Sequence, residues 1–152
     1  MIAFTWLLLL TSSQIGQVHQ VFLSAFLPQG RNDEKTLTAY FNQKIIPRLT
    51  NSPLIIAALD RDQIVGFALF EKWENGEYYL AEMAVLPEYQ RQGIGKKLTL
   101  SIFDKDPAAK KLVIVTDKDN VWARSFYEAI GFISSSFRHP DYPAFVGYEY
   151  TQ

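Results

Sequence analysis

An Asn75-Gly76 dipeptide between two apolar runs is the feature that most restricts how this chain can fold. The runs cover residues 64–73 and 77–86 and have the length and the apolar, aromatic composition of strands. A type I′ turn needs positive φ at both central residues, and Asn-Gly supplies it well. We therefore predict an antiparallel hairpin here, preceded by a further strand at residues 54–59.

The chain on the far side of Pro87 is predicted to alternate between helices and strands. Apolar spacing indicates helices over residues 94–103 and 121–130, and strands at 111–116, around Phe132 and over 144–150. A strand, a helix and a strand in succession imply a parallel pair beside the antiparallel strands. The predicted fold class is therefore α/β, with a mixed sheet and flanking helices.

The first fifty residues are predicted to form one strand and two helices. The apolar run at residues 2–10 reads as a buried strand, and Thr11 to Gln14 as the cap of a helix over residues 13–26. Asn32 or Asp33 is placed to cap a second helix. Pro47 and Pro53 are expected to bracket the exit from that helix.

Composition excludes several classes of protein. The 152 residues contain no repeat or linker, so we expect a single domain over residues 1–152. A net charge of -1 argues against nucleic-acid binding. With no cysteine and two distant histidines, we expect no disulfide and no metal site. The apolar opening run is too short to span a bilayer and lacks a basic flank, so we expect a cytoplasmic protein without a membrane segment.

The segment from Gln90 to Lys96 lies between a predicted strand and a predicted helix. A helix N-terminus offers unpaired N–H groups to an anion, and Gly93 and Gly95 would let a phosphate approach the backbone closely. The alternative is a tight turn that uses glycine for geometry alone. The segment is neither a P-loop nor a dinucleotide fingerprint, because it lacks the Gly-Lys-Ser/Thr ending and the third glycine.

Two motifs in this order resemble those of the GNAT superfamily of acetyl-CoA-dependent N-acetyltransferases. The first runs from Glu82 to Gly95 and reads EMAVLPEYQRQGIG, an apolar strand followed by Gln/Arg-x-x-Gly-x-Gly. The second runs from Asn120 to Phe132 and reads NVWARSFYEAIGF. The resemblance is specific from residue 64 to residue 132 and weak in the flanking regions, which line the acceptor site in the family.

The resemblance implies a mostly antiparallel sheet in which one parallel strand pair is splayed, and acetyl-CoA as the co-substrate. It assigns Met83, Ala84 and Val85 to the pantetheine arm through their backbone. It assigns the pyrophosphate to the backbone of a run of seven residues, Gln90, Arg91, Gln92, Gly93, Ile94, Gly95 and Lys96. Asn120 is read either as a helix N-cap or as a contact with the coenzyme, and Gly131 as the left-handed residue that ends the helix.

The same resemblance suggests two catalytic residues. Tyr127 would protonate the departing thiolate, the alternative being a tyrosine of the core. Glu82 would accept the amine proton through water, the alternative being a solvated or ion-paired glutamate, and Asp117 is the reserve.

The predicted function is acetyl transfer from acetyl-CoA to a primary amine by direct attack, which needs no covalent enzyme intermediate. The alternative is a catalytically silent acyl-CoA-binding module. The acceptor is a small-molecule amine or a protein or peptide amine, and the sequence leaves open whether the chain forms a homodimer.

Overall fold

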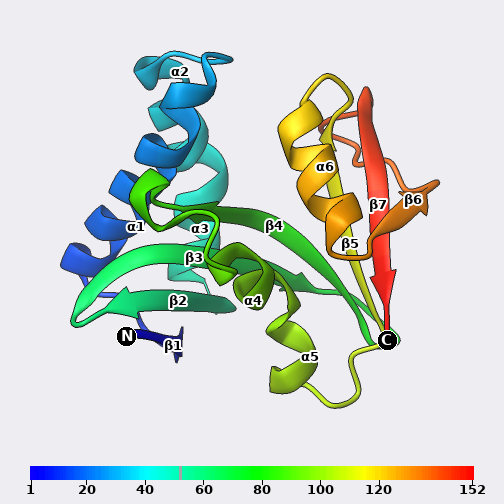
Figure 1. Cartoon of the computed structure of the whole chain (residues 1–152), viewed down its shortest axis with the longest axis horizontal. Helices are drawn as coiled ribbons and strands as arrows, with labels where there is room; N and C mark the ends of the chain where they lie inside the picture. The colour runs from blue at the N-terminus through cyan, green and yellow to red at the C-terminus, as the bar shows by residue number, and fades with distance from the viewer. Residues whose placement is uncertain (52) are drawn as a thin grey trace. The chain divides into compact units, whose positions relative to one another are not determined.

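The computed structural model describes residues 1–51 and 53–152 (Figure 1). The strands are β1 (Ile2–Leu7), β2 (Ile55–Asp60), β3 (Gln63–Lys72), β4 (Glu77–Val85), β5 (Lys111–Asp117), β6 (Ile133–Ser135) and β7 (Phe145–Thr151). The α-helices are α1 (Ser12–Phe26), α2 (Glu34–Tyr40), α3 (Ile46–Thr50), α4 (Ile94–Leu100), α5 (Ile102–Lys105) and α6 (Val121–Ala129). Short helical segments are η1 (Leu27–Gln29), η2 (Phe41–Ile45) and η3 (Pro87–Tyr89).

The strands form one sheet in the order β1-β2-β3-β4-β5-β7-β6. Strand β4 pairs parallel with β5, whereas β1 with β2, β2 with β3, β5 with β7 and β6 with β7 pair antiparallel. The predicted mixed, mostly antiparallel sheet with flanking helices is therefore confirmed. The chain divides into two compact units, unit 1 (residues 1–70 and 82–101) and unit 2 (residues 71–81 and 102–152), and β3 and β4 contribute to both.

Unit 1 is built on the buried strands β2 and β3. Its first helix begins as predicted, since Thr11 and Gln14 form a reciprocal capping box at the start of α1. Helix α4 packs against β3 at Gly66, where an added Cβ would lie 3.2 Å from the Leu98 side chain. In Figure 1, α1 and α3 lie near β3, and α2 lies above them, further from the strands.

The second helical region begins and ends where the sequence indicated. It begins as predicted after Asp33, whose carboxylate accepts a hydrogen bond from the Thr36 N–H at 2.8 Å. As predicted, the helix ends between Pro47 and Pro53, at Thr50. The π-helical η2 joins α2 to α3, so Pro47 falls in the first turn of α3, where a missing N–H breaks no helical bond.

Unit 2 begins with the predicted hairpin. Asn75 and Gly76 have φ values of 59° and 75°, as a type I′ turn requires. Gly76 is also needed for space, because a Cβ there would lie 2.6 Å from the Ala108 carbonyl oxygen. The hairpin therefore depends on glycine for two physical reasons.

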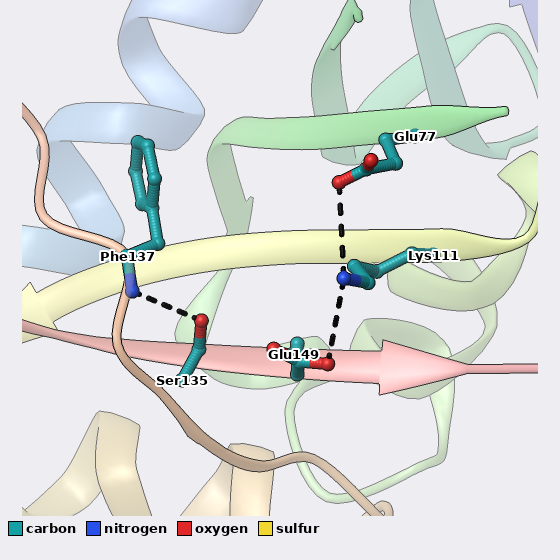
Figure 2. Close-up of polar contacts among 5 residues, drawn as sticks. All are labelled: Glu77, Lys111, Ser135, Phe137 and Glu149. Carbon is teal, nitrogen blue, oxygen red and sulfur yellow. Dashed lines mark hydrogen bonds and ion pairs between the residues drawn. The ribbon is translucent and has the colours of Figure 1, made fainter. Parts of the chain in front are cut away.

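The parallel pair in unit 2 is joined by charged side chains as well as by the backbone. Strands β4 and β5 pair over Glu77–Tyr79 and Lys111–Val113. Figure 2 shows the Lys111 ammonium between the Glu77 and Glu149 carboxylates, at 3.8 and 3.7 Å. One lysine on β5 thus contacts an acid on each neighbouring strand, β4 and β7. Partly exposed pairs of this kind stabilise weakly, so they specify strand neighbours more than they add stability.

Helix α6 ends in the manner expected from Gly131. The Gly131 N–H donates to the Glu128 carbonyl at 3.2 Å and the Phe132 N–H to the Tyr127 carbonyl at 3.0 Å, which is a Schellman motif. Gly131 has a φ of 111°, in the region that favours glycine. The predicted role of Gly131 is confirmed, and the motif fixes Tyr127 in the last turns of α6.

Gly147 allows the segment after β6 to cross β7 closely, and this contact generates a stability prediction. A Cβ at residue 147 would lie 2.5 Å from the Phe137 carbonyl oxygen, and Figure 2 shows Phe137 donating its N–H to Ser135 in that segment. We expect Gly147→Ala to lower the free energy of unfolding by about 1–3 kcal/mol through overpacking.

The matched control is Gly16→Ala in α1, where a Cβ would meet nothing within 4 Å. Alanine removes the entropic cost of a helical glycine, so this variant should gain about 0.5–1 kcal/mol. Urea denaturation measures both changes. Equal effects of the same sign in the two variants would contradict the assignment of Gly147 to close backbone packing.

Candidate active site

The start of the loop between β4 and α4 is held by hydrogen bonds within unit 1. The Leu86 N–H donates to the Val65 carbonyl at 2.9 Å, and the Tyr89 hydroxyl donates to Asp60 at 2.5 Å. The Gln90 side-chain amide turns back and donates to the Val85 carbonyl at 2.9 Å. These bonds fix the start of the loop against β2, β3 and β4.

The loop backbone has the conformation of an anion site. Arg91 and Gly93 have φ values of 62° and 80°, and left-handed residues in a turn direct successive N–H groups toward one side. Gly93 caps α4, and the Lys97 N–H makes the first helical bond, to the Gly93 carbonyl at 3.1 Å. The N–H groups before Lys97 in the first turn therefore have no partner within the helix.

The structure refines which loop residues serve this role. The Gln90 N–H donates to the Pro87 carbonyl at 3.2 Å, so the backbone of Gln90 is used within the turn. Ile94 is buried and anchors the helix, whereas the side chains of Arg91 and Lys96 are exposed. The Lys97 ammonium lies 4.5 Å above the Phe4 ring and is used in a cation–π contact. An anion site here would rest on the backbone from Arg91 to Lys96.

Glu82 lies on β4 in the same unit as this loop, three residues before Val85. The Tyr40 hydroxyl donates a hydrogen bond to Glu82 Oε2 at 3.3 Å. Burial raises the pKa of Glu82 from 4.5 to about 7, although the Tyr40 hydrogen bond, the Met83 N–H and the charge of Arg48 each lower it. A carboxyl group that ionises near neutral pH has the pKa expected of a general base.

Sequence reasoning missed the group of residues around Glu82. Tyr40 and Arg48 come from α2 and α3, on the two sides of the π-helical η2. The Tyr40 ring stacks on Phe22 of α1 with 5.9 Å between centroids and an interplanar angle of 15°. The spacing of polar residues at positions 40, 44 and 48 was the available signal, but it is equally typical of a solvated helix face.

Two further candidates, Asn120 and Tyr127, belong to unit 2, where Asn120 caps α6 and Tyr127 lies within it. The Asn120 side chain accepts the Ala123 N–H at 3.1 Å, so the N-cap reading is confirmed, while a contact with coenzyme stays a prediction. The Tyr127 ring makes edge contacts with Phe126 and Phe132, at 5.1 and 5.3 Å. Tyr127 is partly exposed, unlike a fully enclosed core tyrosine.

Two other polar residues of unit 2 have structural roles. Asp117 accepts the Asp119 N–H at 3.0 Å in the turn after β5. His139 Nδ1 accepts the Asp141 N–H at 3.0 Å within the loop before β7, and the ring contacts Tyr79, Phe137 and Tyr142. These bonds shape the two loops.

Two further properties concern the described residues, 1–51 and 53–152. Among them, no group of three or more histidine, aspartate or glutamate side chains could hold a metal ion. In the same part of the chain, no helix is both long and apolar enough to cross a membrane.

Solved structures share this fold over nearly the whole chain. The PaiA N-acetyltransferase from Thermoplasma acidophilum, in complex with coenzyme A, is similar with a TM-score of 0.82 and 17% identity, covering 100% of this chain and 99% of that one. A GNAT family acetyltransferase from Elizabethkingia anophelis, with acetyl-CoA bound, is similar with a TM-score of 0.66 and 18% identity, covering 99% and 98%. The fold is therefore that of N-acetyltransferases.

The sequence itself identifies the family. The model of the acetyltransferase (GNAT) family matches residues 16–132, and the chain belongs to that family. This confirms the family resemblance seen in the two motifs.

Among curated proteins, N-alpha-acetyltransferase 30 of Schizosaccharomyces pombe is 37% identical over 81 residues, which cover 49% of this chain. The match spans 54% of that relative's length.

Gly93 provides a test of the anion site. A Cβ at Gly93 would meet nothing within 4 Å, so Gly93→Asp adds a charge without a steric clash, although the φ of 80° strains the backbone of any residue other than glycine. The added carboxylate would repel the negatively charged pyrophosphate and should weaken coenzyme A binding at least about tenfold, or about 1.4 kcal/mol. Isothermal titration calorimetry measures this affinity.

Gly30→Asp is the matched control, because Gly30, the C-cap of η1, has a φ of 71° and equally open space. It carries the same backbone strain and the same added charge, yet should bind coenzyme A like the parent. An equal loss in both variants, or no loss in folded Gly93→Asp, would remove the pyrophosphate from this loop.

Proposed function

We propose that this chain transfers the acetyl group of acetyl-CoA to an amine by direct attack on the thioester, with Glu82 as the general base. The observation that supports this most is the Glu82 carboxyl, which ionises near neutral pH and lies in the same compact unit as the loop from Arg91 to Lys96. In this proposal Met83, Ala84 and Val85 hold the pantetheine arm, and the loop backbone holds the pyrophosphate.

The acceptor that we propose is an α-amine at the N-terminus of a peptide or protein. Deprotonating a lysine amine of pKa 10.4 at pH 7 costs about 4.6 kcal/mol, whereas an α-amine near 7.8 costs about 1 kcal/mol. A base with a pKa of about 7 is matched to the deprotonation of the α-amine. The similarity to a relative named N-alpha-acetyltransferase 30 supports the same choice.

Tyr127 and Asn120 complete the proposal. Tyr127 would protonate the departing thiolate, and Asn120 would contact the coenzyme while capping α6. We further propose that the two compact units act as a single domain in the cytoplasm. Whether a homodimer forms is open to measurement by light scattering.

The direct test measures thiol release from acetyl-CoA with a panel of amines. Peptides with free N-termini should be acetylated faster than the same peptides with blocked N-termini and a free lysine, and faster than polyamines. Release with polyamines alone would overturn the acceptor assignment. Binding of acetyl-CoA without release to any amine would instead support the silent acyl-CoA-binding module.

The role of Tyr127 predicts a specific kinetic change. Tyr127→Phe keeps the ring contacts with Phe126 and Phe132, so fold and coenzyme affinity should remain. The kcat should fall by about 10²-fold, which is the scale for a positioned acid. Tyr148→Phe is the control, because that hydroxyl bonds Arg124 and Glu128 and its loss should affect stability rather than kcat. A kcat within about twofold of the parent would return Tyr127 to a core role.

Glu82→Gln should change the pH dependence of the rate. Above about pH 7 the loss relative to the parent should shrink as pH rises, because the amine deprotonates in solution and needs no base. Below that pH the loss should level off, because Glu82 in the parent is itself protonated. Steady-state rates from about pH 6 to 9.5 measure the ratio.

The control for that series is Glu34→Gln, at an exposed glutamate in the first turn of α2. It should follow the parent at every pH. A ratio of Glu82→Gln to parent that is constant across the range would remove Glu82 as the base, and Asp117→Asn would then enter the same series.

A further inference from the structure

We infer that Tyr40 is the positioning residue for Glu82: its hydroxyl holds the carboxylate by a hydrogen bond to Oε2 and keeps the base oriented and ionised in a buried setting. The inference rests on the proposed role of Glu82. Tyr40 and Glu82 are 42 residues apart in the sequence, and the bond between them measures 3.3 Å.

The Tyr40 ring is fixed by its surroundings. It stacks on Phe22, which is 2% exposed, with 5.9 Å between the centroids. Phe22 in turn contacts Phe26 and Phe41, at 5.0 and 5.7 Å. Tyr40 is also the last residue of α2, directly before the π-helical turn. Such turns recur at functional sites because they redirect side chains without ending the helix.

The polar groups that act on the Glu82 carboxyl come from three elements. Tyr40 of α2 donates a hydrogen bond, the Met83 N–H of β4 donates another, and Arg48 of α3 contributes positive charge. All three favour the ionised carboxylate and oppose the effect of burial. A buried carboxylate that loses a donor becomes harder to ionise, so removing the Tyr40 hydroxyl raises the pKa of Glu82.

This role is distinguishable from two others. A tyrosine that only stabilised the fold would change unfolding and leave the pH profile of the rate in place. A tyrosine that bound the acceptor would change KM and leave the pKa of Glu82 in place. A positioning residue changes kcat at neutral pH, and the loss recovers as pH rises.

The first measurement compares Tyr40→Phe with the parent in kcat and KM from about pH 6 to 9.5. Phenylalanine keeps the ring on Phe22 and removes only the hydroxyl. The acidic limb of kcat should move up by about 0.5 to 1 pH unit, the scale of one ordinary net hydrogen bond. KM for the peptide should stay within about twofold. If the acidic limb of the kcat profile does not move, or if only KM changes, the inference is overturned.

Tyr78→Phe is the matched control. The Tyr78 hydroxyl donates to Asp106 at 2.6 Å in unit 2, which is also a tyrosine bond to a carboxylate. This variant loses the same kind of bond and should keep the parent's pH profile. Equal shifts in both variants would mean that any lost tyrosine bond alters the profile, and would overturn a specific role for Tyr40.

The second measurement needs no activity. Protein labelled with ¹³C at the glutamate carboxyl carbons is titrated by NMR, and the Glu82 resonance is assigned by its absence in Glu82→Gln. In Tyr40→Phe the Glu82 pKa should rise above the value near 7 in the parent. An unchanged pKa in the folded variant overturns the inference. Failure of the parent to acetylate any amine would overturn the proposed function alone, because the titration would still report on Tyr40.

Discussion

The partly buried carboxyl of Glu82, held between strand β4 and helices α2 and α3, is the most constrained polar group of unit 1. Removing a carboxylate from water is costly, and the surrounding donors compensate only in part, since the pKa remains raised at about 7. The folded chain therefore holds the Glu82 proton more tightly than an unfolded chain would. The contribution of protonated Glu82 to the free energy of unfolding is present at low pH and is lost as pH rises from about 4.5 through 7. Ionisation of Glu82 therefore lowers the stability of the fold.

The loop proposed to bind the coenzyme follows a different physical principle, in which the backbone would bind the anion and side chains hold the backbone. Arg91 and Gly93 take left-handed conformations, while Gln90 and Tyr89 fix the approach through bonds to Val85 and Asp60. A site made of N–H groups tolerates side-chain changes, provided that φ values and anchors are kept. This requirement explains why the family motif has glycines and a glutamine at fixed spacing.

Local rules were sufficient wherever a short segment determines its own conformation. The Asn75-Gly76 turn, the Thr11 and Asp33 caps and the Gly131 termination each depend on a few neighbouring residues, and each was predicted. Pro47 and Pro53 were predicted to bracket the end of the second helical region, which ends between them at Thr50, although Pro47 itself lies inside the helix. A proline breaks an α-helix because its ring clashes with a carbonyl one turn earlier, but the π-helical η2 alters that turn and lets the helix continue.

The sequence by itself determined the class of fold, the family and the two catalytic candidates, because those follow from periodicity and from motifs of fixed spacing. Only the tertiary structure decided that Glu82 ionises near neutral pH and that Tyr40 donates to it. The physical reason is that a pKa depends on burial and on donors brought from other elements, here α2 and α3, which lie some forty residues from β4 in the chain. No local pattern encodes a contact across such a separation.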